Sequence, residues 1–487
     1  MKTLRSVLRL FTTGLSLAAT APSPASPLRV AAASRTSAQA DRPPLFSLGD
    51  TAWLRAQKLN CEKTKTCFEN LRTQGFTLVP CCVVPCSVVP CCVVPCCVVP
   101  CLHDKGFNGR PALVDETITT LNAAPGRSPS DPAQPNYWDH VASIVDTAAA
   151  NGIIVAIAPV SSHTVRRTPF TAALVAPYID QVAPRSQSCA NVIWLKGGSG
   201  RGHENADLWQ VIGETLKYRA PPRLVSAHPF RRTVSTEWFK DTPWLDFPRF
   251  TCFQRRYHQD TDGRKFSEDN WRHVLASRAP APSRPVLDAE PASETTPQGL
   301  HKPEEPCRTG HDSRQYADWS VFSGAPGHTF GANSVRQVEI PLEKKPASGA
   351  QGFILERLDS EGAGQMCHLK NLPLSRPLLG RVNDRAHAAG DEGEKYDRVL
   401  ITRGAGGVLA STDTGARSRS SCARAASGRS RADGSIRAPA KRRRPVPTPA
   451  PTRSPSPRRA RPPQPTTGSS SSTRLRKTSR YPAHSDL

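Results

Sequence analysis

Short apolar runs alternate with longer amphipathic stretches along the chain as far as about residue 340. Apolar runs that stop at small or polar residues are typical of buried parallel strands, and apolar residues at helical spacing predict helices. We expect strands at residues 44–53, 76–79, 153–160, 191–195, 223–228, 244–250, 285–288 and 327–331. We expect helices at residues 61–73, 136–151, 171–182 and 206–216.

This order of elements places the chain in the α/β class. Repeated strand–helix alternation favours a (β/α)8 TIM barrel over residues 42–340. A doubly wound sheet is the alternative, but no G-x-G-x-x-G motif follows the first strand. Beyond the barrel, shorter β-like runs at 398–402 and 407–410 predict a small, partial β-sandwich-like domain over residues 341–412.

Two of the predicted strands end abruptly at residues that matter for chemistry. The segment NVIWLKGGS (191–199) ends at Ser199, and RPVLDAEP (284–291) carries Glu290 near its end. Active sites of parallel α/β barrels lie at the carboxyl ends of the strands. A carboxylate there suits a nucleophile or a base, and an ion-paired glutamate at a strand terminus is the alternative.

The formal net charge of +24 is concentrated in the last part of the 487-residue chain. From Arg417 onward there are 18 Lys and Arg residues against Asp433 and Asp486, among many Ser, Pro and Ala. We therefore expect residues 413–487 to form a disordered basic tail, and the charge indicates little about partners of the folded body. Basic clusters such as KRRR (441–444) bind phosphates in other proteins, but no aromatic residues interleave them, so we expect no nucleic-acid partner.

The N-terminus has the layout of a secretory signal. Lys2, Arg5 and Arg9 precede a mostly apolar stretch that ends in Ala19-Thr20-Ala21. We expect a signal peptide over residues 1–21 and a secreted, extracellular product. A transit peptide is the rival, because the first 40 residues contain no acid. No later apolar run reaches the roughly 18 residues that a membrane span needs, so we expect no span.

Residues 79–101 form a low-complexity insertion, VPCCVVPCSVVPCCVVPCCVVPC. Its cysteine pairs suggest metal binding, but no histidine pattern accompanies them. Proline every five residues excludes a helix and disfavours a central strand. We therefore interpret the repeat as an expansion without chemistry and expect no metal site. In an oxidising compartment its cysteines are prone to mispairing, and a further hypothesis is that the repeat prevents folding.

A set of ordered motifs carries a family resemblance: GDTAW (49–53), RTQGFT (72–77), VIWLKGG (192–198), HPF (228–230), PWLDF (243–247), DAEPASE (288–294), QGLH (298–301) and GHTFGAN (327–333). Together they resemble the apiosidase-like glycoside hydrolases over about residues 42–410. The resemblance implies a TIM barrel that hydrolyses O-glycosidic bonds in plant or microbial polysaccharide, the best-known case being apiose side chains of pectin. GQMCHLKNLPLSRP (364–377) resembles the start of the collagen-binding-type β domain that commonly follows this barrel.

The resemblance also implies a catalytic pair, which this chain has in part. The family's expected residues are an Asp after the Gly-Gly of the fourth strand and the Glu of a D-x-E-P motif, and these positions hold Ser199 and Glu290. Glycoside cleavage uses two carboxyl groups, and losing a general acid removes roughly 10²–10⁴-fold in rate. Glu204 and Asp207 lie nearby, but both suit the N-terminus of the next helix, where the helix dipole favours acids.

Further residues are candidates for substrate binding, each with a structural alternative. Aspartate at the first strand end can cap a helix, tryptophans can be core residues, and histidines can serve only as hydrogen-bonded supports. Cys252, Phe253 and Gln254 replace the small and polar residues expected there from the family. The candidate substrate-binding residues are Asp50, Trp53, His228, Trp244, Glu294 and His328.

The sequence thus supports more than one function. The first hypothesis is a glycoside hydrolase with Glu290 as nucleophile or base, impaired by Ser199, with a polysaccharide or oligosaccharide as partner. The second is a non-catalytic carbohydrate- or matrix-binding relative, and the third is nucleic-acid binding through the basic tail. The sequence indicates no cofactor and no metal, and it leaves the sugar, the linkage and the oligomeric state open.

Overall fold

The computed structural model describes most of the body of the chain, within the unit Met1–Ser430. The predicted signal peptide, nearly all of the cysteine repeat after Val83 and the basic tail after Thr414 lie outside the described residues. The described residues are 28–30, 37–39, 45–83, 112–113, 120–121, 136–167, 170–260, 266, 268–279, 284–300, 302–341, 347–376, 380–387, 392–405 and 407–414.

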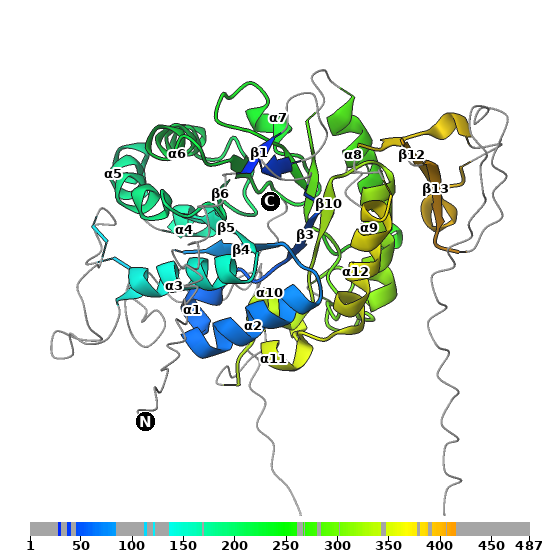
Figure 1. The fold of residues 1–487 in the computed structure, drawn as a ribbon, viewed down its shortest axis with the longest axis horizontal. Helices are drawn as coiled ribbons and strands as arrows, with labels where there is room; N and C mark the ends of the chain where they lie inside the picture. Colours follow the sequence, from blue (N-terminus) through cyan, green and yellow to red (C-terminus); the bar gives the residue numbers. More distant parts are fainter. Residues whose placement is uncertain are drawn as a thin grey trace, which may run out of the picture. The chain divides into compact units, whose positions relative to one another are not determined.

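Parallel strands form the centre of the fold (Figure 1). One six-stranded sheet has the order β10-β3-β4-β5-β6-β7, and β8 pairs with β9 in parallel. A parallel bridge between Ser226 and Phe247 connects β7 to the approach to β8, and one between Glu294 and Ala332 connects the segments after β9 and β10. Consecutive strands are therefore neighbours and the last lies beside the first, as in a (β/α)8 barrel. The strands are β3 (Ser47–Asp50), β4 (Leu78–Cys82), β5 (Ile154–Ala158), β6 (Val192–Lys196), β7 (Val225–Ala227), β8 (Arg249–Thr251), β9 (Leu287–Glu290) and β10 (Gly327–Phe330).

Helices follow the strands and cover the outside of the sheet (Figure 1). The four helices expected from periodicity are confirmed as α2, α3, α5 and α6. The first three of these begin at side-chain caps: Asn60 accepts a hydrogen bond from the Lys63 amide, Asn136 and Asp139 form a capping box, and Thr171 accepts from the Leu174 amide. The helices are α1 (Arg55–Lys58), α2 (Cys61–Thr73), α3 (Tyr137–Ala150), α4 (Ser162–Arg167), α5 (Ala172–Val182), α6 (Ala206–Arg219), α7 (Thr236–Phe239), α8 (Asn270–Arg278), α9 (Gly310–Phe322), α10 (Asn333–Gln337), α11 (Ile354–Arg357) and α12 (Glu361–Leu374).

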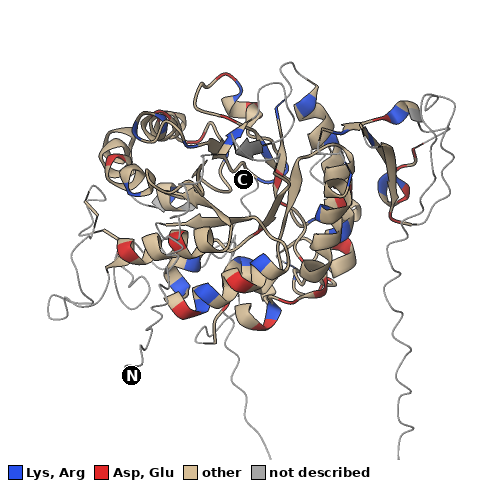
Figure 2. Cartoon of the chain, viewed as in Figure 1, with Lys and Arg blue, Asp and Glu red and all other residues tan. Residues whose placement is uncertain are grey.

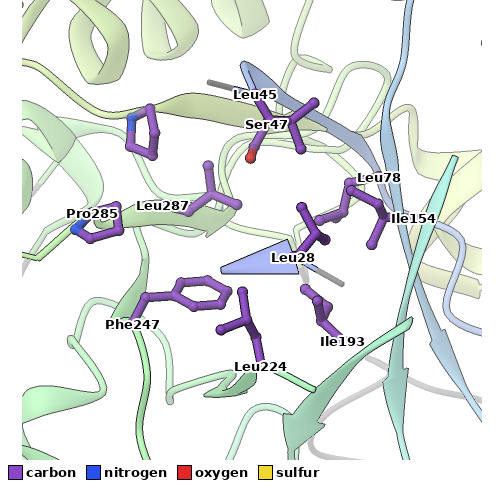
Figure 3. Close-up of a pocket in the computed structure, with 11 residues that line it drawn as sticks. Leu28, Leu45, Ser47, Leu78, Ile154, Ile193, Leu224, Phe247, Pro285 and Leu287 are labelled. Atoms are coloured by element: carbon purple, nitrogen blue, oxygen red, sulfur yellow. The ribbon is translucent and has the colours of Figure 1, made fainter. Parts of the chain in front are cut away.

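Strand alternation divides the apolar side chains between two layers. Leu78, Ile154 and Ile193 fill the inside of the barrel. Their neighbours on the same strands, Val79, Val155 and Val192, point to the other side and pack against the helices. At the amino end of the strands, Leu28 from β1 (Leu28–Val30) points into this interior and leaves a cavity of only about 20 Å³ (Figure 3). β1 pairs antiparallel with β2 (Ser37–Gln39). The amino end is thus closed by apolar side chains, and the carboxyl end remains for a site.

The structure corrects the interpretation of residues 364–377. They lie mostly in α12, which packs against α9, and do not begin a β domain. Met366, Leu369 and Pro373 are buried at helical spacing, which explains the helix. The β-like runs further on do form strands, in an antiparallel sheet of β11 (Val382–Asn383), β12 (Val399–Gly404) and β13 (Gly407–Thr412).

A buried polar network joins this small sheet to the barrel. Glu268 is fully buried and accepts hydrogen bonds from the Tyr316 hydroxyl at 2.5 Å and the Tyr396 hydroxyl at 2.8 Å. Its carboxylate also pairs with Arg308 Nη1 at 3.2 Å and Arg256 Nη1 at 3.3 Å. Tyr316 belongs to α9, and Tyr396 precedes β12, so one carboxylate holds both elements.

Within the described residues, no helix combines the length and apolarity needed to cross a membrane.

Replacing Glu268 with alanine is expected to lower the free energy of unfolding by about 3–5 kcal/mol, because it leaves Arg308 buried without its counter-charge. Urea denaturation of the two proteins measures this difference. Glu69, which pairs with Lys65 on the exposed face of α2, is the control, since Glu69→Ala should cost at most about 0.5 kcal/mol. A loss below 1 kcal/mol for Glu268→Ala would contradict a supporting role for the network.

Candidate active site

Glu290 is the last residue of β9, at the carboxyl end of the barrel, and it is almost completely buried. Its Oε1 accepts a hydrogen bond from Arg336 Nη1 at 3.0 Å. Its Oε2 lies 3.3 Å from His228 Nε2. Arg336 comes from α10, after β10, and His228 comes directly after β7. Three strand ends that are distant in sequence therefore meet at one carboxylate.

The surroundings of Glu290 keep it ionised. Burial raises the pKa of Glu290, but the hydrogen bond with His228 and the positive charge of Arg336 together outweigh this effect and lower its pKa to about 2. At neutral pH the group is a carboxylate, which suits a nucleophile, a base or the stabilisation of a developing positive charge. A group with such a low pKa cannot serve as the proton donor.

His228 is neutral in this setting. Burial lowers the pKa of His228, and the nearby Glu290 offsets part of that effect. Because Glu290 is an acceptor, the proton of the neutral ring belongs on Nε2, and Nδ1 has no hydrogen-bond partner among the described residues. Trp53 packs edge-on against this ring, with centroids 4.9 Å apart, and is only partly buried. The structure thus places His228 beside Glu290, and Trp53 against His228.

Arg249 adds a second buried cation near the same carboxylate. It is fully buried on β8, and burial lowers the pKa of its guanidinium to about 10, while the charges of Asp288 and Glu290 act in the opposite direction. None of its three guanidinium nitrogens has a hydrogen-bond partner within the described part of the chain. Sequence analysis missed both Arg249 and Arg336. The only signal was an arginine in the mostly apolar strand segment FPRFT (247–251), whereas NSVRQV (333–338) is mostly polar and gave none.

The loop of Ser199 adjoins this group. A methyl group added to the preceding residue, Gly198, would be in ordinary van der Waals contact with His228, 3.9 Å from the imidazole Cδ2. Ser199 itself has a φ of 52°, and its carbonyl accepts a long hydrogen bond of 3.5 Å from Arg166 Nη2. A serine hydroxyl cannot protonate a leaving group at neutral pH. Glu204 is paired with Arg166 at 3.2 Å.

Two predicted substrate-binding residues face the helix layer. Asp50 ends β3 beside Arg55 and Cys67, and burial raises its pKa to about 7 despite the charge of Arg55. The first residue before α1 is Leu54, so Asp50 does not cap that helix either. His328 shares a strand face with Phe330, which packs on Phe76 and in the core outside the barrel. Both residues were candidates for substrate binding with a structural alternative, and strand alternation directs them to the outside of the barrel.

Trp244 and Glu294 also make contacts that support the fold: Trp244 packs on a helix, and Glu294 accepts hydrogen bonds at the start of another. Trp244 is buried against Gly213 of α6, and its indole Nε1 donates a hydrogen bond of 2.9 Å to Gln210. Glu294 accepts hydrogen bonds from Ser360 Oγ at 2.7 Å and from the Gly362 amide at 3.0 Å, at the N-terminus of α12. Packing on α6 thus covers the ring of Trp244, and α12 takes up the carboxylate of Glu294. The structure therefore joins Glu290, His228 and Trp53 with the Ser199 loop, and leaves the other four candidates out.

The Apiosidase-like catalytic domain family matches residues 32–380 of the chain. The chain belongs to this family. The match ends before β11, so it does not include the antiparallel sheet and does not confirm the expected β domain.

Solved structures agree with the family. A protein described as a glycoside hydrolase is 32% identical, with a TM-score of 0.70, covering 78% of this chain and 81% of that one. A glycoside hydrolase family 5 protein from Bacteroides vulgatus is also 32% identical, with a TM-score of 0.69 and 78% of each chain covered. No curated protein matches the sequence. The predicted resemblance and the predicted barrel are thereby confirmed.

The burial of His328 without a hydrogen-bond partner among the described residues predicts that the folded protein loses stability in acid. Burial lowers the pKa of His328 to about 3, and neither ring nitrogen has a hydrogen-bond partner among the described residues. Above pH 6.5 the ring is neutral in both states. Below it, the unfolded chain binds a proton that the folded chain refuses, so His328 removes about 1.4 kcal/mol of stability per pH unit between pH 6.5 and 3.

Urea denaturation of His328→Leu at pH 7.5, 5.5 and 4.5 measures this effect. We expect nearly unchanged stability at pH 7.5 and a progressively more stable variant, relative to the parent, at lower pH. His258→Leu, at an exposed position, is the control. An unchanged difference between His328→Leu and parent at all three pH values would show that His328 takes up a proton equally readily in the folded and unfolded chains, and would contradict the lowered pKa.

Proposed function

We propose that this protein binds plant or microbial polysaccharide at the carboxyl end of its barrel and hydrolyses O-glycosidic bonds slowly, with Glu290 as nucleophile or base. The observation that carries the proposal is the ionised carboxylate of Glu290, held by His228 and Arg336 beside the loop of Ser199. The family membership supports a sugar substrate. A secretory leader at residues 1–21 and an extracellular location belong to the same proposal.

The chain retains the nucleophile or base of glycoside cleavage, Glu290, and lacks the proton donor expected at residue 199. Glu290 can attack the anomeric carbon, or activate a water molecule against it, because its carboxylate is ionised at neutral pH. Departure of the leaving oxygen normally needs a proton from a second carboxyl group. Ser199 supplies none, and Glu204 is engaged with Arg166. Bonds to leaving groups that depart without protonation are therefore the ones that this site cleaves best.

A second candidate function is carbohydrate binding without turnover. Both oxygens of Glu290 already have partners, Arg336 on one and His228 on the other, which weakens the carboxylate as a nucleophile. Trp53, partly buried beside His228, offers an aromatic ring to a sugar. Glycan affinity with no cleavage of activated substrates distinguishes this function from the first.

The test compares two leaving groups in variants at residue 199. We expect a panel of 2,4-dinitrophenyl glycosides to include substrates cleaved by the native chain, and we expect Glu290→Gln to abolish this cleavage. Ser199→Asp should increase the rate on the matching natural oligosaccharide by about 10²–10⁴-fold while changing the dinitrophenyl rate little. Aspartate also tolerates the positive φ of this position.

Ser199→Asn is the matched control, because asparagine has the shape of aspartate and the same backbone tolerance but donates no acidic proton. Equal rates for the Asp and Asn variants on the natural substrate would refute the assignment of residue 199. Cleavage that survives Glu290→Gln would refute the role of Glu290. Silence on every dinitrophenyl glycoside, with retained glycan binding, would favour the second function.

A pH profile tests the coupling between Arg336 and Glu290. Removing the guanidinium in Arg336→Met removes a charge that lowers the pKa of Glu290, so this pKa should rise by about 1–3 units. Because the ionised form is the active one, activity on the dinitrophenyl substrate should begin to fall at a higher pH in the variant than in the parent. Arg72→Met, at an exposed position of α2, should leave the profile unchanged, and an unshifted acid limb in Arg336→Met would contradict the coupling.

A further inference from the structure

Two aromatic rings and two guanidinium groups form a row of contacts at the carboxyl end of the barrel. The guanidinium carbon of Arg231 lies 5.8 Å from the ring centre of Phe253 and 5.1 Å from that of Phe230. Arg201, two residues after Ser199, lies over the same Phe230 ring at 5.1 Å. These distances are those of cation–π contacts. The row Phe253–Arg231–Phe230–Arg201, the ladder, thus connects the loops after β8, β7 and β6.

The ladder is joined to the site of Glu290 through the backbone. Phe230 comes two residues after His228, whose imidazole contacts the Glu290 carboxylate. The Phe253 amide donates a hydrogen bond of 3.3 Å to the carbonyl of Glu290 itself. Both rings therefore belong to loops that already carry or contact the candidate nucleophile.

Local contacts fix the two loops that carry the rings. The Phe230 carbonyl accepts hydrogen bonds from the hydroxyls of Thr233 at 2.5 Å and Thr251 at 3.0 Å. Thr251 is the last residue of β8 and pairs with Glu290 on β9. Phe253 has a φ of 66°, a left-handed conformation that is strained for a bulky residue. Such strain persists only where the surroundings hold it, and it is found most often at ligand sites.

The ladder is anchored at one end and open at the other. Phe253 is 8% exposed, Phe230 and Arg231 are partly exposed, and Arg201 is exposed. A ligand can therefore reach the outer members. The family resemblance predicts small and polar residues at 252–254, so the ring of Phe253 is a feature of this chain.

The serine at residue 199 restricts the bonds that this site can break. A leaving alcohol has a pKa close to that of water, about 15.7, and needs a proton, whereas a phenol, with a pKa of about 10, departs as the phenolate. Aromatic rings pack on a phenyl group, and guanidinium groups favour negative charge beside it. The missing acid and the ladder thus point to the same kind of leaving group.

We propose that the substrate is an aryl glycoside, a sugar linked to a phenol, and that the ladder holds the aromatic ring. This inference rests on the proposed function. A bond forms between a carboxylate oxygen of Glu290 and the anomeric carbon while the bond from that carbon to the aryl oxygen breaks, and its electron pair leaves on the phenolate. Water then adds its hydroxyl group to the anomeric carbon and restores the carboxylate, and its proton passes to the phenolate. With Glu290 as base, the water attacks directly, and the products are again sugar and phenol.

Binding of matched glycosides to the native full-length chain tests the proposal without requiring turnover. The probes are the phenyl and cyclohexyl glycosides of each sugar in the dinitrophenyl panel, apiose included. The cyclohexyl ring has a similar size but no π face. By isothermal titration calorimetry, we expect at least one phenyl glycoside to bind about tenfold more tightly than its cyclohexyl counterpart.

Phe230→Leu, which keeps the apolar bulk without the aromatic face, should bring this affinity ratio close to one. Tyr218→Leu is the matched control, because it removes an exposed ring that also has an arginine, Arg219, at 5.1 Å, but on α6. The control should keep the phenyl preference. Equal binding of phenyl and cyclohexyl glycosides, binding of neither, or a preference that survives Phe230→Leu would overturn the proposal. If Phe230→Leu fails to fold, the comparison in the native chain still decides.

Cleavage rates separate this proposal from the proposed function. Phenyl and hexafluoroisopropyl glycosides of one sugar have leaving groups of similar acidity, but only the phenyl group can contact the ladder through a π face. We expect kcat/KM to favour the phenyl substrate by about tenfold, and Phe230→Leu to remove this preference without changing the hexafluoroisopropyl rate. A phenyl preference in binding without any cleavage would refute the proposed hydrolysis and still support the aromatic ligand. Cleavage of both substrates at equal rates would support the hydrolysis and overturn the role of the ladder.

Discussion

A buried carboxylate requires positive partners, and the mouth of this barrel is organised around that requirement. Glu290 comes from β9, His228 follows β7 and Arg336 follows β10, so their contacts hold three strand ends in a fixed relation. Taking an ionised group out of water is costly unless hydrogen bonds and opposite charge replace the solvent. The same contacts that make Glu290 tolerable in the fold also set its protonation state. Structure and chemistry are therefore not separable at this position.

The sequence predicted the barrel well, because the signals that define it are local and repeated. Helix 61–73 is confirmed with the same bounds, and the strand ending at Glu290 was recognised from a short apolar run followed by polar residues. α8 and α9 were missed, since α9 begins with Gly310-His311-Asp312-Ser313 and its buried positions include polar residues. α12 was mistaken for the start of a β domain because the resemblance outweighed its own buried spacing at Met366 and Leu369.

The site was harder to predict than the fold. Which side of a strand faces the barrel depends on a register that shifts at single residues. This is why the sequence left the roles of Asp50 and His328 open, and the structure turns both toward the helices. Arg249 and Arg336 carry no motif, and their importance appears only when the strands are closed into a barrel. Long-range electrostatics of this kind cannot be inferred from spacing along the chain.

The apolar plug formed by Leu28 has a consequence for maturation of the polypeptide. Leu28 stands among Leu78, Ile193 and Phe247 at the floor of the barrel, although it comes from the extreme amino-terminal part of the described chain (Figure 3). Any protease that trims the N-terminus must therefore cut before this leucine, or it removes a piece of the core along with the leader. Cleavage after the predicted leader, residues 1–21, would leave only residues 22–27 in front of Leu28. An acidic or basic fusion tag joined directly at this point would carry charge toward the apolar floor of the barrel. The central strands are mostly tan in Figure 2, and the blue and red segments lie mainly on the helices.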